Sequence, residues 1–247
     1  PRSPPLYSSA ASDVYKRQDN CKGGGVAKQC DYGTMTAVDR RAGSRSAQSM
    51  TLPRFALQLS GLTPAHPDAP ARFCLTLVGR AGDFADRVCA AMSRIKIWPQ
   101  VRRVGMQELE WQPRIGSSRQ LYPCCFEIVS PLRWWRGRSF PSRFEPAYLV
   151  EKIALRIRHL ALAEGLNVST FPLADLSQDV RLSKCDLRGA PGGKARNRDI
   201  DFDGILGKAE VEIATRWWPI LEAGQWVNAG RHVTYGAGEF VFAPSMR

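Results

Sequence analysis

The segment that organises this sequence lies near its carboxyl end, at residues 221–242, and reads LEAGQWVNAGRHVTYGAGEFVF. Its glycines are Gly224, Gly230, Gly236 and Gly238, of which the last three can adopt positive φ angles and let backbone N–H groups approach a ligand closely. Arg231 supplies a forked cation, and His232 titrates near neutral pH. The segment predicts a ligand-binding loop that is closed by a strand at residues 239–242.

The charge of the chain favours a polyanionic ligand. Its 247 residues include 35 Lys and Arg against 23 Asp and Glu, a formal charge of +12 at pH 7. Counterion release and electrostatic steering draw such a chain to polyanions, although charge alone does not separate RNA, DNA and acidic membranes. No apolar run approaches the roughly 18 residues that cross a bilayer, so we expect a soluble protein.

The cysteines argue against a metal centre. Seven are present, without a C-x-x-C pair and without a histidine at zinc-ligand spacing. We therefore expect a reduced, cytoplasmic protein, and we predict neither a metal nor a cofactor.

The first 49 residues are predicted to lie outside the fold. Residues 1–18 lack hydrophobic periodicity and resemble translated adapter sequence, and residues 19–49 are rich in Gly, Ser and Arg. Met35 and Met50 are candidate start residues, and a basic RNA-binding tail is the alternative interpretation. Residues 1–49 hold eight basic and four acidic residues, so the remainder still carries a formal charge of +8.

The rest of the chain predicts two α+β units in series. In the first, residues 50–118, the apolar patterns predict strands at 54–59, 72–78 and 104–111 and an amphipathic helix at 83–95. This order of elements is typical of an α+β sandwich.

A polar segment at residues 112–120 is the predicted joint to the second unit, residues 119–247. That unit begins with a strand at 124–129 and continues with a helix from Pro146 to about Glu164, because proline suits the first turn of a helix. Further strands are predicted at residues 180–187, 205–213 and 239–242, with a short helix near 217–221.

Three basic groups of side chains accompany these elements. On the helix of the second unit, Lys152, Arg156 and His159 form a stripe at i, i+4 and i+7; a solvated face is the simplest interpretation, and contact with RNA is the alternative. The loop RGAPGGKARNR at residues 188–198 contains Lys194, Arg196 and Arg198.

The third group is RWWRGR at residues 133–138, where Arg133 and Arg136 flank two tryptophans. Tryptophan rings between cations suit the stacking of unpaired bases. Since neighbouring strand residues point to opposite faces, we expect one ring in the core and the other, assigned to Trp135, near RNA.

Several of these segments resemble the CRISPR repeat-processing endoribonucleases of the RAMP superfamily, the nucleases that mature guide RNA. The strongest resemblance is carried by GILG at residues 204–207, PILEAG at 219–224 and NAGRHVTYGAG at 228–238. Weaker matches lie at residues 72–79, 130–133, 149–160 and 196–198. The resemblance implies two tandem ferredoxin-like domains, cleavage of CRISPR repeat RNA without metal, and retention of the guide RNA with other subunits of an effector complex.

Metal-free cleavage needs an activated 2′-OH, a proton for the leaving 5′-oxygen and cationic donors for the phosphorane. His232, Arg231 and Tyr235 are the predicted catalytic residues, and His159 with Arg156 is the alternative. The predicted RNA contacts near the catalytic residues are Gly230, Thr234, Gly236 and Gly238. The competing interpretation of His232 is a side chain that grips phosphate without acid–base work.

The family often has a catalytic histidine in its first domain, where this chain has only His66, in the loop at residues 64–67. From the resemblance as a whole, the leading hypothesis is an endoribonuclease that makes guide RNAs. A non-cleaving RNA-binding subunit of the same superfamily and a basic DNA-binding or architectural protein are the alternatives.

Overall fold

The computed structural model describes residues 36–38, 51–53, 55–58, 74–93, 115–133, 144–166, 171–190, 204–230, 233 and 236–245. The chain divides into two compact units, and each is described by itself. One unit comprises Pro1–Phe55 and Leu77–Gln112, and the other comprises Ala56–Thr76 and Pro113–Arg247. The domain limits predicted from the sequence, 50–118 and 119–247, stay a prediction.

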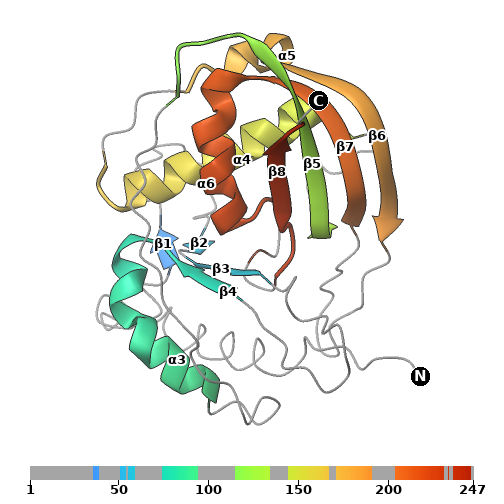
Figure 1. Ribbon diagram of the computed structural model, residues 1–247. Helices are drawn as coiled ribbons and strands as arrows, with labels where there is room; N and C mark the ends of the chain where they lie inside the picture. The colour runs from blue at the N-terminus through green and yellow to red at the C-terminus, as the bar shows by residue number, and fades with distance from the viewer. Residues whose placement is uncertain are drawn as a thin grey trace, which may run out of the picture. The chain divides into compact units, whose positions relative to one another are not determined.

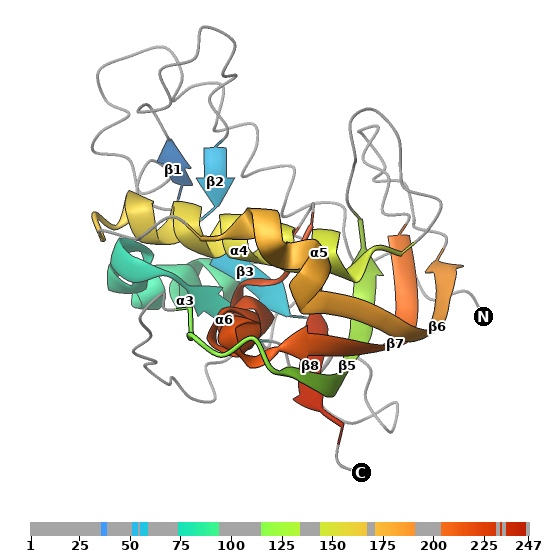
Figure 2. The same ribbon diagram turned by 90° about the horizontal axis from the view of Figure 1, so that it is seen from above.

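The larger unit contains a four-stranded antiparallel sheet (Figures 1 and 2). Across the sheet the strands are β6 (Val180–Ala190), β7 (Gly204–Ala214), β5 (Leu121–Leu132) and β8 (Phe240–Pro244). Helix α4 (Pro146–Ala163) connects β5 to β6, and helix α6 (Trp218–Val227) connects β7 to β8. The chain order β-α-β-β-α-β with this arrangement of strands is the ferredoxin-like fold.

Helix α4 has the boundaries that its sequence predicts. Pro146 occupies the first turn, where its missing N–H would have no partner. At the other end Gly165 has φ 80°, its N–H donates to Leu162 O at 3.0 Å, and Leu166 N–H donates to Ala161 O at 3.0 Å. This pair of bonds is a Schellman motif, which requires the left-handed conformation that glycine adopts readily.

The core of this unit lies between the sheet and the two helices. Helix α4 buries one face, formed by Leu149, Val150, Ile153, Ile157, Leu160 and Ala161. From the sheet, the Phe126 ring contacts those of Phe240 and Phe242, with centroids 5.9 and 5.5 Å apart. A Cβ on Gly224 would meet Ile153 Cγ2 at 2.5 Å, so glycine permits the close packing of α6 on α4.

Helix α6 corrects the sequence-based prediction. The predicted helix ended near residue 221, whereas α6 continues to Val227. The first seven residues of the glycine-containing segment are therefore helical. The reason is packing: Leu221, Ala223 and Val227 are buried, and this burial outweighs the low helix propensity of Gly224.

Shorter elements complete the described chain. They are β1 (Thr36–Val38), β2 (Thr51–Pro53), β3 (Phe55–Gln58), β4 (Cys74–Leu77), η3 (Gly79–Phe84), α3 (Ala85–Ser93), η4 (Leu173–Asp175), α5 (Leu176–Asp179) and η5 (Thr215–Trp217). β1 pairs with β2 in antiparallel fashion, and β3 is the neighbour of β4 in a second two-stranded sheet. β1 lies within the segment predicted to be outside the fold, and the strand predicted at 104–111 lies outside the described residues.

Candidate functional site

The glycine-rich loop, residues 228–239, is closed at its base by its own backbone. Ala229 N–H donates to Gly238 O at 2.8 Å, and Gly238 N–H donates to Pro131 O at 3.0 Å. The second bond joins the loop to β5. Ala229, Val233 and Ala237 are all buried, so the described part of the loop packs as core.

The loop glycines allow this close approach. Gly230 has φ 78° and Gly238 has φ 73°. A Cβ on Gly230 would overlap Arg133 O, and a Cβ on Gly238 would overlap Ala229 O. Gly236 N–H donates to Val233 O at 3.2 Å. The described contacts of these glycines are internal, and their predicted contacts with RNA stay a prediction.

The end of the glycine-rich loop, at Glu239, bonds to an irregular stretch of β5. The register of β5 against β7 shifts between Ile128 and Leu132. In this interval Val129 N–H and Ser130 N–H donate to Glu239 O at 2.9 and 3.3 Å, and Ser130 Oγ accepts from Glu239 N–H at 2.8 Å. The SPLR motif at residues 130–133 thus forms the seat of the glycine-rich loop.

Three segments, one of them the middle of the glycine-rich loop, are attached at this end of the sheet, which we call the loop end. Leu132 pairs with Ile205, and Ala190 pairs with Gly204, so β5 ends where β7 begins and where the β6–β7 connection starts. The attached segments are residues 134–143, 191–203 and 231–235. A Cβ on Gly204 would lie 2.9 Å from Leu132 O, so glycine is needed for this junction.

Most of the predicted site residues belong to these three segments and lie outside the described residues: Trp135, Arg136, Lys194, Arg196, Arg198, Arg231, His232, Thr234 and Tyr235. What the structure brings together is their points of attachment. Arg133, which is described, is the last residue before residues 134–143, and its carbonyl faces Gly230.

Helix α4 also reaches the start of the loop. Arg156 Nε donates to Val227 O, the last carbonyl of α6, at 2.9 Å. Burial lowers the pKa of Arg156 to about 10, which leaves it charged at neutral pH. His159 is exposed, and Lys152 Nζ lies 3.3 Å from Glu151 Oε1. The predicted stripe is therefore not uniform, because Arg156 is a partly buried link, Lys152 is half-buried and lies over the Tyr148 ring, and only His159 is exposed.

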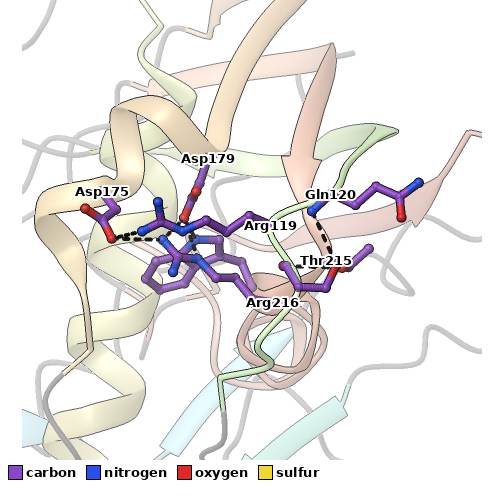
Figure 3. Close-up of polar contacts among 8 residues, drawn as sticks. Arg119, Gln120, Asp175, Asp179, Thr215 and Arg216 are labelled. Carbon is purple, nitrogen blue, oxygen red and sulfur yellow. Dashed lines mark hydrogen bonds and ion pairs between the residues drawn. The ribbon is translucent and has the colours of Figure 1, made fainter.

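The opposite end of the sheet carries a group that the sequence analysis did not predict. We define the ion-pair cluster as Arg119, Asp175, Asp179, Arg216 and Trp217 (Figure 3). Asp179 accepts from Arg216 Nε at 2.6 Å and from Trp217 Nε1 at 2.8 Å, and Arg216 Nη2 contacts both aspartates. Arg119 pairs with Asp175.

The backbone reinforces this cluster. Arg216 N–H donates to Ser118 O, and Gly116 N–H donates to Arg216 O, both at 3.0 Å. Asp179 and Arg216 are only 2% and 7% exposed. Buried charges need partners, and these have them, so the cluster joins residues 115–120 to α5 and to the end of β7 and is not a reactive site.

Ala209, Val211 and Ile213 of β7 are buried, and the other face of the sheet carries a ladder of acidic and basic side chains on neighbouring strands. Lys208 Nζ lies 3.3 Å from Glu127 Oε2, and Lys184 Nζ lies 3.8 Å from Glu210 Oε1. Asp186 and Glu212 stand opposite Lys208 and Arg181 in the strand register. These residues are four acids and three bases, so this face does not favour a polyanion.

Within the described residues, no group of three or more His, Cys, Asp or Glu side chains could hold a metal ion. In the same part of the chain, no helix is long and apolar enough to cross a membrane.

The described residues define an α+β protein with a ferredoxin-like sheet, and the segments that contain the predicted site residues are attached at one end of that sheet. Among solved structures, the chain is similar to Cas6 TTHB231 of Thermus thermophilus in a product complex, with 15% identity, a TM-score of 0.57 and coverage of 77% of this chain and 82% of that one. It is also similar to Cas6 TTHA0078 in a product complex, with 16% identity, a TM-score of 0.54 and coverage of 86% and 89%.

A partial Cas6-RT-Cas1–Cas2 complex contains a third similar chain, with 12% identity, a TM-score of 0.51 and coverage of 100% of this chain and 44% of that one. No family model and no curated protein sequence matches. At these identities the likeness is one of fold. The predicted fold class, α+β with two tandem ferredoxin-like domains, is confirmed, and the predicted resemblance is confirmed as a likeness of fold to Cas6 structures.

Proposed function

We propose that the chain is an endoribonuclease that cleaves CRISPR precursor RNA within its repeats and so produces guide RNAs. The observation that carries the proposal is that three segments are attached at the loop end of the sheet, where Leu132 pairs with Ile205 and Ala190 with Gly204. Those segments contain the cations and aromatic rings that bind RNA. The fold shared with Cas6 product complexes supports the same function.

The proposed reaction is attack of a ribose 2′-OH on the adjacent phosphate, without a metal ion. The bond from phosphorus to the 5′-oxygen breaks, and the products are a 2′,3′-cyclic phosphate and a 5′-OH. His232 accepts the proton of the attacking 2′-OH and gives a proton to the leaving 5′-oxygen, Arg231 stabilises the charge of the phosphorane, and the Tyr235 hydroxyl donates a hydrogen bond at the phosphate. His159 with Arg156 on α4 is the alternative catalytic pair.

RNA is proposed to bind along the loop end of the sheet. The phosphate contacts are assigned to Lys194, Arg196 and Arg198, and to Thr234 with the loop glycines Gly230, Gly236 and Gly238. Arg133 and Arg136 flank the position where a base stacks on Trp135. The sheet face that carries the Lys208–Glu127 and Lys184–Glu210 pairs has no excess of bases among these residues, so we do not assign RNA binding to it.

The proposed partners are CRISPR repeat RNA, the guide RNA that results from it, and other CRISPR proteins of an effector complex in the cytoplasm. The similar chain in the Cas6-RT-Cas1–Cas2 complex supports association with other CRISPR proteins.

The test is incubation of the purified protein with labelled stem-loop RNAs of CRISPR repeat sequence in EDTA. Cleavage to a 2′,3′-cyclic phosphate is expected, and a substrate with one 2′-deoxy nucleotide at the cut should stay intact. An RNA that is bound but not cut would indicate a non-cleaving subunit. Preference for duplex DNA would indicate an architectural protein.

A further inference from the structure

Asn228, the residue that follows α6, has an unusual backbone conformation. Its φ is 57° and its ψ is 170°, and it is the only residue other than glycine with positive φ in the described part of the chain. Residues with a Cβ are strained in this region, and such strain persists only where the surrounding structure requires it. Asn228 is also fully buried.

The Asn228 amide joins three parts of the fold. Nδ2 donates to Leu57 O of β3 at 2.9 Å and to Ala237 O, on the far side of the glycine-rich loop, at 3.3 Å. Both hydrogens of the amide therefore have backbone acceptors. Asn228 Oδ1 is buried and has no partner among the described residues. The amide thus bonds the two ends of the loop to each other and bonds the loop to β3, which lies beside the end of α6 (Figures 1 and 2).

A second bond docks β3 without involving the loop. Gln58 Nε2 donates to Gln225 O on α6 at 2.6 Å. The two bonds differ in one respect that an experiment can use: the Gln58 bond holds β3 against the helix, whereas the Asn228 bonds also fix both strands of the loop base.

We propose that Asn228 is a positioning residue for RNA cleavage, because its amide bonds the beginning of the glycine-rich loop both to the end of the loop at Ala237 and to β3 at Leu57. This inference rests on the proposed function. In-line attack requires the catalytic groups to be held within a narrow range of positions, and groups on a loop depend on the bonds that support it.

The choice of variants separates the amide from the strain. Asn228→Gly relieves the positive φ and removes the bonds, so it keeps the backbone path but loses the link. Asn228→Asp has the shape of asparagine but no N–H groups, and it would place a carboxylate against two carbonyl oxygens. Gln58→Ala is the matched control, since it removes one bond to the end of α6 and leaves the loop base intact.

The measurements are single-turnover cleavage at saturating RNA, affinity for a non-cleavable 2′-deoxy substrate, and hydrogen exchange of residues 229–239 and 55–58. For Asn228→Gly we expect cleavage slower by about 10- to 100-fold, affinity within about threefold of wild type, and faster exchange in both segments while α4 is unchanged. Asn228→Asp should be slower still. Gln58→Ala should cleave within about threefold of wild type.

Wild-type cleavage by Asn228→Gly, or unchanged exchange in residues 229–239, would overturn the inference. An equal loss in Gln58→Ala would overturn it too, because docking of β3 would then be sufficient. If the wild-type protein does not cut RNA, the proposed function is wrong, and the exchange of the loop then decides whether Asn228 holds it.

Discussion

The two ends of the four-stranded sheet satisfy their polar groups in different ways. At the start of β5, the ion-pair cluster joins side chains to side chains, and its buried carboxylate, Asp179, has two donors. At the end of β5, the described bonds run mostly from backbone to backbone, through Pro131, Gly238 and Ala229. Breaking a buried charge pair is costly because one charge loses its partner, whereas backbone bonds can fix a loop and leave its cations for a ligand. The difference predicts that the first end determines stability and the second determines activity.

The largest expected effect concerns the loop end. His232→Ala should slow cleavage of the repeat RNA by roughly 10²–10⁴-fold, the range for the loss of a general acid or base. Affinity for uncut RNA should change little. Single-turnover rates and filter binding measure the two quantities.

His159→Ala is the control for that variant. Loss of activity in His159→Ala alone would move the site to α4, and activity in both variants would indicate cleavage assisted by arginine. Loss of affinity along with activity in His232→Ala would mean that this side chain grips phosphate.

The opposite end should respond in stability. Asp179→Ala leaves Trp217 Nε1 without its acceptor and the buried Arg216 with Asp175 as its remaining partner, so the loss should reach at most the roughly 3–5 kcal/mol of a fully broken buried pair. Urea unfolding measures the loss. Arg119→Ala, at a side chain 52% exposed, should cost no more than about 1 kcal/mol. The folded molecules of Asp179→Ala should still cleave RNA at close to the wild-type rate. A large fall in the cleavage rate per folded molecule would contradict the division between the two ends.

Gly238→Ala tests the backbone closure. The new methyl group would overlap Ala229 O at a φ of 73°, so the loop base should open. We expect cleavage to fall about tenfold or more, with a loss of stability of roughly 1–3 kcal/mol. Gly189→Ala is the matched control, since nothing lies within 4 Å of the position of its Cβ. Equal effects of the two substitutions would show that the closure is unimportant.

The smallest effect per residue is expected from the β6–β7 connection. Replacing Lys194, Arg196 and Arg198 together by alanine should weaken binding of all RNA sequences. It should also reduce the slope of log affinity against log salt by about 2, if each side chain neutralises one phosphate of a single strand. Fluorescence anisotropy between 50 and 200 mM salt, the range over which phosphate contacts have a large effect, measures this slope.

The control for the triple variant removes the same charge from the ladder on the opposite sheet face, at Arg181, Lys184 and Lys208, which are all exposed. Its slope should change much less. If the control weakens binding as much as the loop variant, net charge and not position determines the affinity.

Local patterns predicted much of this fold. The helix from Pro146 ends at Gly165 because proline and glycine have local conformational preferences that the sequence displays directly. Strands β5, β7 and β8 likewise follow apolar or alternating patterns, whereas β6 is mostly exposed. The extension of α6 to Val227 was not predicted, because the burial of its apolar side chains against α4 and β8 outweighs a central glycine.

The polar contacts were less predictable. Asp179 and Arg216 meet across 37 residues of sequence, and Asn228 and Leu57 across 171, so neither pair leaves a local pattern. The attachment of three basic segments at one end of the sheet depends on the register of β5, β6 and β7. Asn228 lies inside the segment 221–242, but nothing in the sequence separates it from its neighbours, and its backbone φ of 57° is seen only in the structure.

The register shift in β5 also bears on the order in which the protein is made and folded. Ser130 and Glu239 bond across 109 residues, and β8 can pair with β5 only after residues 240–244 have been synthesised. Contacts between distant residues form slowly, because the entropy of a long loop is lost before the bonds are gained. The loop end should therefore assemble last during synthesis, so a partly synthesised chain would have its hydrophobic helices in place before it could cut RNA.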